Sequence, residues 1–149
     1  MENVLVVVHL LAAAVWVGGT VALVFVGVPV VRTLEGETRA PAMKLLGQRW
    51  RPIGYGALFV LGVTGVPLAT REWKSGTTFH LVLIAKVVLA VCLVAVSYTH
   101  NFVLGPRVAE EMREGSRRSY RKLVVVGWIS LALTVLVPVL GVVLARLAG

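Results

Sequence analysis

The stretch FHLVLIAKVVLAVCLVAVSYTHNFVL, residues 79–104, decides the fold class of this chain of 149 residues. It is 26 residues long, and only Lys86 and His100 interrupt its apolar interior. About 20 apolar residues are enough to cross the hydrocarbon core of a bilayer as a helix. Because no water is available there, the backbone groups must bond to one another, which an α-helix achieves within one segment. The stretch therefore predicts a transmembrane helix.

Three further apolar runs accompany this stretch along the chain. They cover residues 4–31, 53–69 and 123–144, and they are 28, 17 and 22 residues long. The whole chain is 58% hydrophobic and 15% charged, whereas soluble domains are about 45–50% apolar and about 25% charged. This composition excludes a soluble globular protein and a disordered one. We expect an all-α, integral membrane four-helix bundle that forms a single domain over residues 1–149.

The basic residues are unevenly divided between the two sides of the predicted bundle. Eleven fall in the first and third connections: Arg32, Arg39, Lys44, Arg49, Arg51, Arg107, Arg113, Arg117, Arg118, Arg121 and Lys122. The opposite side has three, namely Arg71, Lys74 and Arg146. Because lysine and arginine accumulate on the cytoplasmic side, both termini are predicted to lie outside. The net charge of +8 is thus explained by the positive-inside rule for proteins of the lipid bilayer, and no nucleic-acid partner is expected.

The third connection, GPRVAEEMREGSRRSYRK at residues 105–122, alternates acidic and basic residues. We expect it to extend the third helix or to form a short interfacial helix before Gly115 and Ser116. One interpretation is a surface for a partner or for lipid headgroups. The more common case is a solvated, charged connector without a further role.

The first helix carries a polar face that contains His9, Trp16 and Thr20. Their spacings of seven and eleven residues return to nearly the same side of a helix. His9, about two turns from the outer end, is a candidate ligand of haem iron or of a metal ion, or a proton relay. The alternative is a histidine that bonds to a neighbouring helix. Gly18 and Gly19 allow the close approach of a helix or of a flat macrocycle.

The third helix has a second polar face, which contains Lys86, Ser97 and His100. Lys86 lies about 10 Å from the outer end, a depth at which a charge must face the bundle or extend outward. It could neutralise a haem propionate or carry a proton. His80 lies on the same side of the membrane as His9, so these two histidines could ligate one haem. His100 lies near the cytoplasmic end, too far from His9 to share a metal ion.

Other polar residues have simpler interpretations. Arg49 and Arg51 flank Trp50 at the cytoplasmic interface, as membrane-anchoring residues commonly do, or they bind a propionate or phosphate. Pro67 is expected to end or kink the second helix. In the fourth helix, Thr134 is expected to bond the carbonyl group that Pro138 frees, without a chemical role.

Four segments carry a resemblance to a known family. HLLAAAVWVGG at residues 9–19 resembles the opening helix of the copper-resistance D (CopD-like) family of bacterial membrane proteins. The resemblance continues through QRWRPIGYGALFVLGVTGVP at 48–67, LVLIAKVVLA at 81–90 and LGPRVA at 104–109. It implies a multi-pass protein of the bacterial cytoplasmic (inner) membrane with a role in copper handling.

The same superfamily is similar to the HemJ-type protoporphyrinogen oxidases, which bind b-type haem. In those enzymes a histidine of the first helix and a lysine of the third helix are functional, and His9 and Lys86 match these positions. The chain departs from the enzymes at VGVPVVR, residues 26–32, where they have a Leu-Pro-Arg run.

The leading hypothesis is a b-type haem protein with a redox or electron-transfer role, whose partner is a quinone or a porphyrin compound. The candidate metal ligands are His9 and His80, and the other candidate cofactor contacts are Trp16, Arg49, Arg51 and Lys86. No catalytic residue is assigned, and oxidoreductase activity is left open. Copper handling is the alternative, although the thiol of Cys92 stands alone and soft Cu(I) prefers several sulfur ligands. A non-catalytic partner subunit is the third hypothesis, and a homodimer through glycine and alanine faces is compatible with all three.

Overall fold

The computed structural model describes residues 2–71, 76–113 and 118–148, and these residues are almost entirely helical, with no strand among them. The chain is therefore all-α, as its apolar runs predict. Four helical segments are long and apolar enough to cross a membrane: Val4–Arg32, Arg39–Thr70, Thr77–Val108 and Tyr120–Leu147. Lys74, Gly115, Ser116 and Arg117, which the sequence analysis assigned to connections, lie outside the described residues.

Two of the four segments contain an internal π-helix. The first consists of α1 (Glu2–Ala22), the π-helix η1 (Leu23–Gly27) and α2 (Val28–Arg32). The third consists of α4 (Thr77–Tyr98), the π-helix η4 (Thr99–Leu104) and α5 (Gly105–Arg113). The second and fourth are the continuous helices α3 (Arg39–Arg71) and α6 (Tyr120–Ala148). A short 3₁₀ turn, η2 (Gly36–Thr38), precedes α3.

The second helix is longer than its apolar run. Helix α3 begins at Arg39, whereas the run begins at Ile53, so most of the expected first connection is helical. An apolar run ends where charges begin, but a helix needs only its backbone bonds and one covered face. That face is supplied by Met43, Leu46 and Trp50, which are half-buried. Pro67 lies inside α3, which continues to Arg71.

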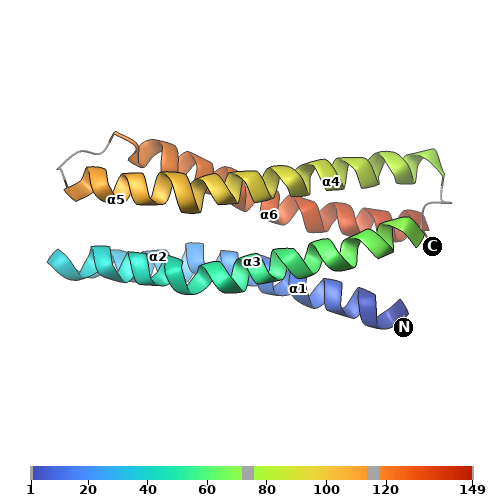
Figure 1. Cartoon of the computed structure of the whole chain (residues 1–149), viewed down its shortest axis with the longest axis horizontal. Coiled ribbons are helices and arrows are strands. Elements are labelled where there is room, and N and C mark those ends of the chain that lie inside the picture. The colour runs from blue at the N-terminus through green and yellow to red at the C-terminus, as the bar shows by residue number, and fades with distance from the viewer. Residues whose placement is uncertain (1, 72–75, 114–117, 149) are drawn as a thin grey trace.

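The helices form two antiparallel pairs (Figure 1). Helix α1 packs mainly against α3, and α4 packs mainly against α6, while α1 and α6 join the two pairs. Figure 1 shows both termini at one end of the bundle, which we call the terminal end. The connection between α2 and α3 and the adjoining ends of α5 and α6 lie at the other end. Most lysines and arginines belong to that second end, which we call the basic end.

The core is small and the outer surface is apolar. A central cluster contains Trp16 of α1, Ala57 of α3 and Leu93 of α4, and half-buried side chains of α1, α3 and α6 pack around it. Many large apolar side chains point outward instead, and Phe59 is 73% exposed. A soluble protein rarely exposes such a continuous apolar surface, whereas lipid covers it in a membrane. The exposure therefore agrees with the four candidate spans.

Candidate functional site

His9 of α1 is held by a hydrogen bond to Thr64 of α3. The His9 Nδ1 atom lies 2.8 Å from the Thr64 hydroxyl oxygen, which lies 2.7 Å from the carbonyl oxygen of Val60. A carbonyl group only accepts, so the single hydroxyl proton of Thr64 is donated to Val60. His9 must then donate its Nδ1 proton to Thr64, which leaves a lone pair on Nε2. In this tautomer an imidazole binds metal through Nε2 while its other nitrogen is held by the protein.

Lys86 of α4 lies within the range of electrostatic interaction with His9. Its side chain is half-buried. The Nζ atom lies over Gly141 of α6, 3.2 Å from the point that a Cβ atom there would occupy. The seven acidic residues of the sequence all lie outside the apolar runs, and Lys86 has no ion-pair partner in the part of the chain that the structure describes. Because an unpaired charge is costly at membrane depth, Lys86 is suited to an anionic group of a ligand.

Trp16 belongs to the packing of the bundle and bonds to the fourth helix. Its side chain is buried, and its indole N–H donates a hydrogen bond of 3.2 Å to the hydroxyl oxygen of Thr134. Thr134 is fully buried and accepts this hydrogen bond from α1. The sequence analysis missed this partner because the two residues are 118 positions apart. The indole of Trp16 also packs against Trp50, with ring centroids 6.2 Å apart. The hydrogen-bonding capacity of Trp16 is therefore used within the protein.

The space above two glycines is filled by Trp50. A Cβ atom at Gly19 would lie 2.0 Å from the Trp50 ring, and one at Gly54 would lie 3.1 Å from it. These glycines let α1 and α3 close around an indole, so the macrocycle considered from sequence has no room against Gly19. By contrast, no atom lies within 4 Å of a Cβ placed at Gly18.

His80 lies at a different level of the bundle from His9. It is near the start of α4, where it meets the edge of the Phe79 ring. His80 precedes Lys86 by six residues, which is about 9 Å along a helix and about 120° around it. His80 and Lys86 therefore lie at different heights and on different faces of α4, and it is Lys86 whose charge interacts with His9. No group of three or more histidine, cysteine, aspartate or glutamate side chains that could hold a metal ion occurs among the described residues.

Arg49 and Arg51 point in different directions because residues two apart lie on nearly opposite sides of a helix. Arg49 is exposed, whereas Arg51 is half-buried and donates a hydrogen bond to the carbonyl oxygen of Asn101 in η4. The guanidinium group also lies over the ring of Phe102, 4.7 Å from its centroid. Arg51 precedes Thr64 by 13 residues, about 20 Å along α3, so both arginines are far from His9.

Arg51 is part of a second polar layer, toward the basic end, that the sequence analysis did not assemble. The imidazole of His100 lies over Gly127, with Nε2 3.2 Å from a Cβ placed there. The side-chain amide of Asn101 donates a hydrogen bond of 2.8 Å to the carbonyl oxygen of Ser97. The Tyr55 hydroxyl approaches the Asn101 side chain but lacks hydrogen-bond geometry to any described residue. The π-helix η4 supplies His100 and Asn101 to this layer. The spacing of apolar residues in the sequence does not indicate a π-helix.

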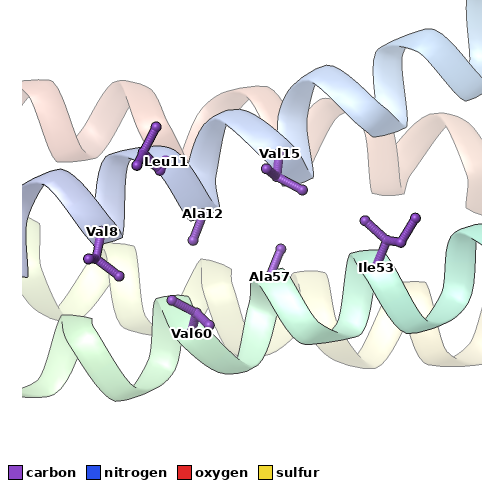
Figure 2. Close-up of a pocket in the computed structure, with 7 residues that line it drawn as sticks. All are labelled: Val8, Leu11, Ala12, Val15, Ile53, Ala57 and Val60. Carbon is purple, nitrogen blue, oxygen red and sulfur yellow. The ribbon is translucent and has the colours of Figure 1, made fainter.

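An apolar groove lies between α1 and α3, and one of its lining residues, Val8, directly precedes His9 in the sequence. It has a volume of about 290 Å³ and opens toward the outside of the bundle. Figure 2 shows the aliphatic side chains that line it: Val8, Leu11, Ala12, Val15, Ile53, Ala57 and Val60. With no ionisable or polar side chain, the groove suits a hydrocarbon chain and can perform no chemistry itself.

Residues 11–117 match the model of a family described as a domain of unknown function, DUF4149. The match covers more than two thirds of the chain, which therefore belongs to the DUF4149 family. It includes Thr64, Lys86 and the second polar layer up to Asn101, and it excludes His9 and all of α6. Neither a curated protein nor a solved structure matches the chain significantly.

Proposed function

We propose that this protein binds b-type haem within the bacterial cytoplasmic membrane and acts in redox or electron transfer. The observation that carries the proposal is the electrostatic interaction of His9, which the Thr64 hydroxyl group holds through Nδ1, with Lys86, a cation that has no ion-pair partner among the described residues. A haem combines an iron that accepts an imidazole with propionates that accept a cation. When bound, it would supply one-electron chemistry.

The residues present fit such a group in three ways. His9 would ligate the iron through Nε2, and Thr64 would hold the imidazole in that tautomer and orientation. Lys86 would pair with a propionate. Trp16, about two turns from His9 on nearly the same face of α1, would form part of the apolar wall of the site. These roles use the positions that resemble the HemJ-type enzymes.

Copper handling, which the CopD-like resemblance implies, has less support from the geometry. A porphyrin brings four nitrogen ligands, so one protein histidine is enough, whereas bare copper needs a set of protein donors. The described residues contain no such set, and Cys92 is exposed on the outer surface. A non-catalytic partner subunit remains the outcome if neither haem nor copper binds.

The membrane orientation is part of the proposal. Both termini lie at one end of the bundle and the basic end is opposite, so the positive-inside rule places His9 and Lys86 in the outer half. An electron partner would reach them from within the bilayer, which favours a lipid-soluble carrier such as a quinone. Labelling of a cysteine at Thr38 from outside intact cells would contradict this orientation.

The test is the absorption spectrum of the purified protein and of two histidine variants. We expect a Soret band that sharpens on reduction, and a His9→Ala protein that retains less than about a tenth of the wild-type haem per chain. A loss of that size corresponds to more than about 1.4 kcal/mol of binding free energy. His100→Ala is the matched control, because His100 is also an interior histidine but lies in the other polar layer.

Three outcomes would contradict the proposal. A His9→Ala protein with full haem content and an unchanged spectrum would remove His9 as the ligand. Equal losses in His9→Ala and His100→Ala would indicate a general disturbance of the bundle. Copper found by elemental analysis, with no Soret band, would favour the copper hypothesis.

A further inference from the structure

The two halves of the chain repeat the same series of elements. Helix α2 begins at Val28 and α5 begins at Gly105, 77 positions later. The π-helices end at Gly27 and Leu104, again 77 positions apart, and α3 and α6 end at Arg71 and Ala148 with the same offset. Because π-helices are rare, their recurrence at one register is not a consequence of apolar composition.

The same offset relates the sequences around the π-helices. FVGVPVV at residues 25–31 and FVLGPRV at residues 102–108 share phenylalanine, valine, proline and valine at corresponding positions. The offset also pairs buried residues with buried residues: Trp16 with Leu93, Val31 with Val108, and Ala57 with Thr134. Corresponding helices run in the same direction, since α1 and α4 both start at the terminal end (Figure 1).

We propose that the chain is an internal duplication of a two-helix unit, and that the candidate site uses the same position of each unit, His9 and Lys86. The two positions are 77 residues apart, each side chain lies against a glycine of the second helix of its own half, Gly65 and Gly141, and the charge of Lys86 interacts with His9. Contacts between the halves are reciprocal, as a pseudo-twofold axis along the bundle requires. Trp16 bonds to Thr134, and the corresponding residues, Leu93 and Ala57, lie in one cluster.

The duplication explains two further residues of the site. Thr64, which bonds His9, corresponds to Gly141, over which the Lys86 Nζ atom lies. One half thus supplies a nitrogen donor with a hydroxyl that fixes it, and the other supplies a cation with the space that it needs. A side chain at Gly141 would displace the Lys86 Nζ atom, which lies 3.2 Å from the point that a Cβ atom would occupy. The ligand must combine an electron-pair acceptor with an anionic group.

Exchange of the site between the halves tests this symmetry in the full-length protein. The exchanged variant carries His9→Lys, Thr64→Gly, Lys86→His and Gly141→Thr together. The two single variants His9→Lys and Lys86→His are expected to lower the Tm by about 4 °C or more. The exchanged variant is expected to regain the wild-type Tm to within about 2 °C. Its haem content, which rests on the proposed function, is expected to return to within about threefold of the wild type, about 0.7 kcal/mol.

The matched control exchanges two residues that the offset does not relate, Arg51→His with His100→Arg, and this pair is expected to restore nothing. The duplication is overturned if the four-residue exchange is as unstable as the sum of the single changes, or if the control recovers equally. A wild-type protein without haem would end the proposed function, while the Tm comparison would still decide the duplication.

A second observation concerns the basic end. A cavity of about 490 Å³ is lined by Arg118, Arg121 and Lys122 on one side and by the apolar Leu104, Val125 and Val126 on the other. It lies where the candidate spans end, at Val108 and Tyr120. Cations above an apolar floor match an amphiphile at the membrane interface.

The acid nearest to this cavity is already engaged. Glu111 accepts hydrogen bonds from the hydroxyl and the backbone N–H of Ser119, the latter at 2.7 Å. These bonds, with help from the charges of Arg107 and Arg118, hold the pKa of Glu111 below its usual value. Glu111 therefore stays charged and is engaged at the start of α6 by Ser119.

We infer that this cavity binds the phosphate of an anionic phospholipid of the cytoplasmic leaflet, with the acyl chains along Val125 and Val126. Basic pockets between transmembrane helices bind such headgroups in general. The test compares binding of phosphatidylglycerol and phosphatidylcholine to detergent-purified protein. Arg121→Gln with Lys122→Gln should weaken phosphatidylglycerol binding by about fivefold or more, about 1 kcal/mol.

The control is Arg39→Gln with Lys44→Gln, which removes the same charge from exposed positions at the same end of the bundle. It should change the binding less than about twofold, about 0.4 kcal/mol. Equal losses in both variants would overturn the site in favour of a general charge effect. Competition by millimolar inorganic phosphate as strong as that by the lipid would overturn the assignment to a phospholipid.

Discussion

The two polar layers of the bundle use similar side chains in opposite ways. The terminal-end layer contains His9, Thr64 and Lys86, and the basic-end layer contains Arg51, Asn101 and His100. Each combines an imidazole with a cation, and neither contains an acid. Arg51 bonds to a backbone carbonyl group and lies over an aromatic face, although its Nε has no hydrogen-bond partner, whereas Lys86 has no ion-pair partner in the described chain. A membrane-buried cation indicates a ligand only when the protein does not already satisfy it.

The geometry of the helices explains this difference. In η4 the π-helical backbone turns the Asn101 carbonyl group toward a neighbouring helix, where Arg51 reaches it. Around His9 the helices are regular, so their carbonyl groups are used within each helix and only side chains are available. Among the described residues, the terminal-end layer therefore leaves its cation without an ion-pair partner, whereas the cation of the basic-end layer is bonded within the protein.

Replacement of Arg51 should have the largest effect on stability. Arg51→Met removes a charged hydrogen bond and a cation–π contact, so we expect a loss of about 2 kcal/mol in the free energy of unfolding. Haem content should not change, because Arg51 is far from His9. Denaturant unfolding in detergent measures the loss, with the exposed Arg49→Met as a control that stays within about 0.5 kcal/mol. An equal loss in Arg49→Met would mean that the interior contacts of Arg51 contribute nothing.

Thr64→Val should affect both stability and the ligand. It removes one hydrogen bond inside the membrane, which contributes about 1 kcal/mol. It also releases His9, and loss of such a partner typically lowers affinity by about 10- to 100-fold. Haem titration of the purified variant gives the affinity, and Thr70→Val, an exposed threonine of the same helix, is the control. Wild-type affinity in Thr64→Val would show that the hydroxyl group does not position the imidazole.

Lys86→Met should change the stability of the protein in the opposite direction to Arg51→Met, and this difference would distinguish the two polar layers. Removal of an unpaired buried charge relieves its desolvation, so the haem-free protein should gain about 2 °C in Tm. Haem affinity should fall, because the propionate loses its cation. Thermal unfolding of the haem-free variant decides the point. A loss of stability like that of Arg51→Met would mean that Lys86 has a partner within the protein.

The smallest effect is expected from lowering the pH, which acts here through Glu111, a residue of neither polar layer. Glu111 lies outside the membrane spans, and hydrogen bonds from the Ser119 side chain and backbone lower its pKa below the ordinary value of 4.5. A lowered pKa in the folded state stabilises the protein above about pH 4.5, and this stabilisation is lost as the pH falls through the lowered pKa. The Tm of the wild type should therefore decrease toward that of Glu111→Gln below about pH 4.5. Glu37→Gln is the control, and a constant difference down to pH 3 would contradict this account.

Much of the architecture was readable from local sequence. The four apolar runs predicted the four spanning helices. For the third connection, either an extension of the third helix or a short interfacial helix was predicted, and the structure shows the helix continuing into α5. The start of α3 at Arg39 was missed because charges interrupt the apolar run while the helix itself continues. The sequence also predicted His9 and Lys86 at similar depth, and in the structure the charge of Lys86 interacts with His9.

The sequence by itself thus determined the helices, their alternating directions and the faces that carry polar groups, because these depend on neighbours within a few turns. Only the tertiary structure decided the partners. It set Thr64 against His9, Thr134 against Trp16, and Trp50 over Gly19. These pairs join residues 55, 118 and 31 positions apart, and they depend on which helices pack together and at what height. No local period encodes that choice, since every apolar face fits lipid as well as it fits another helix.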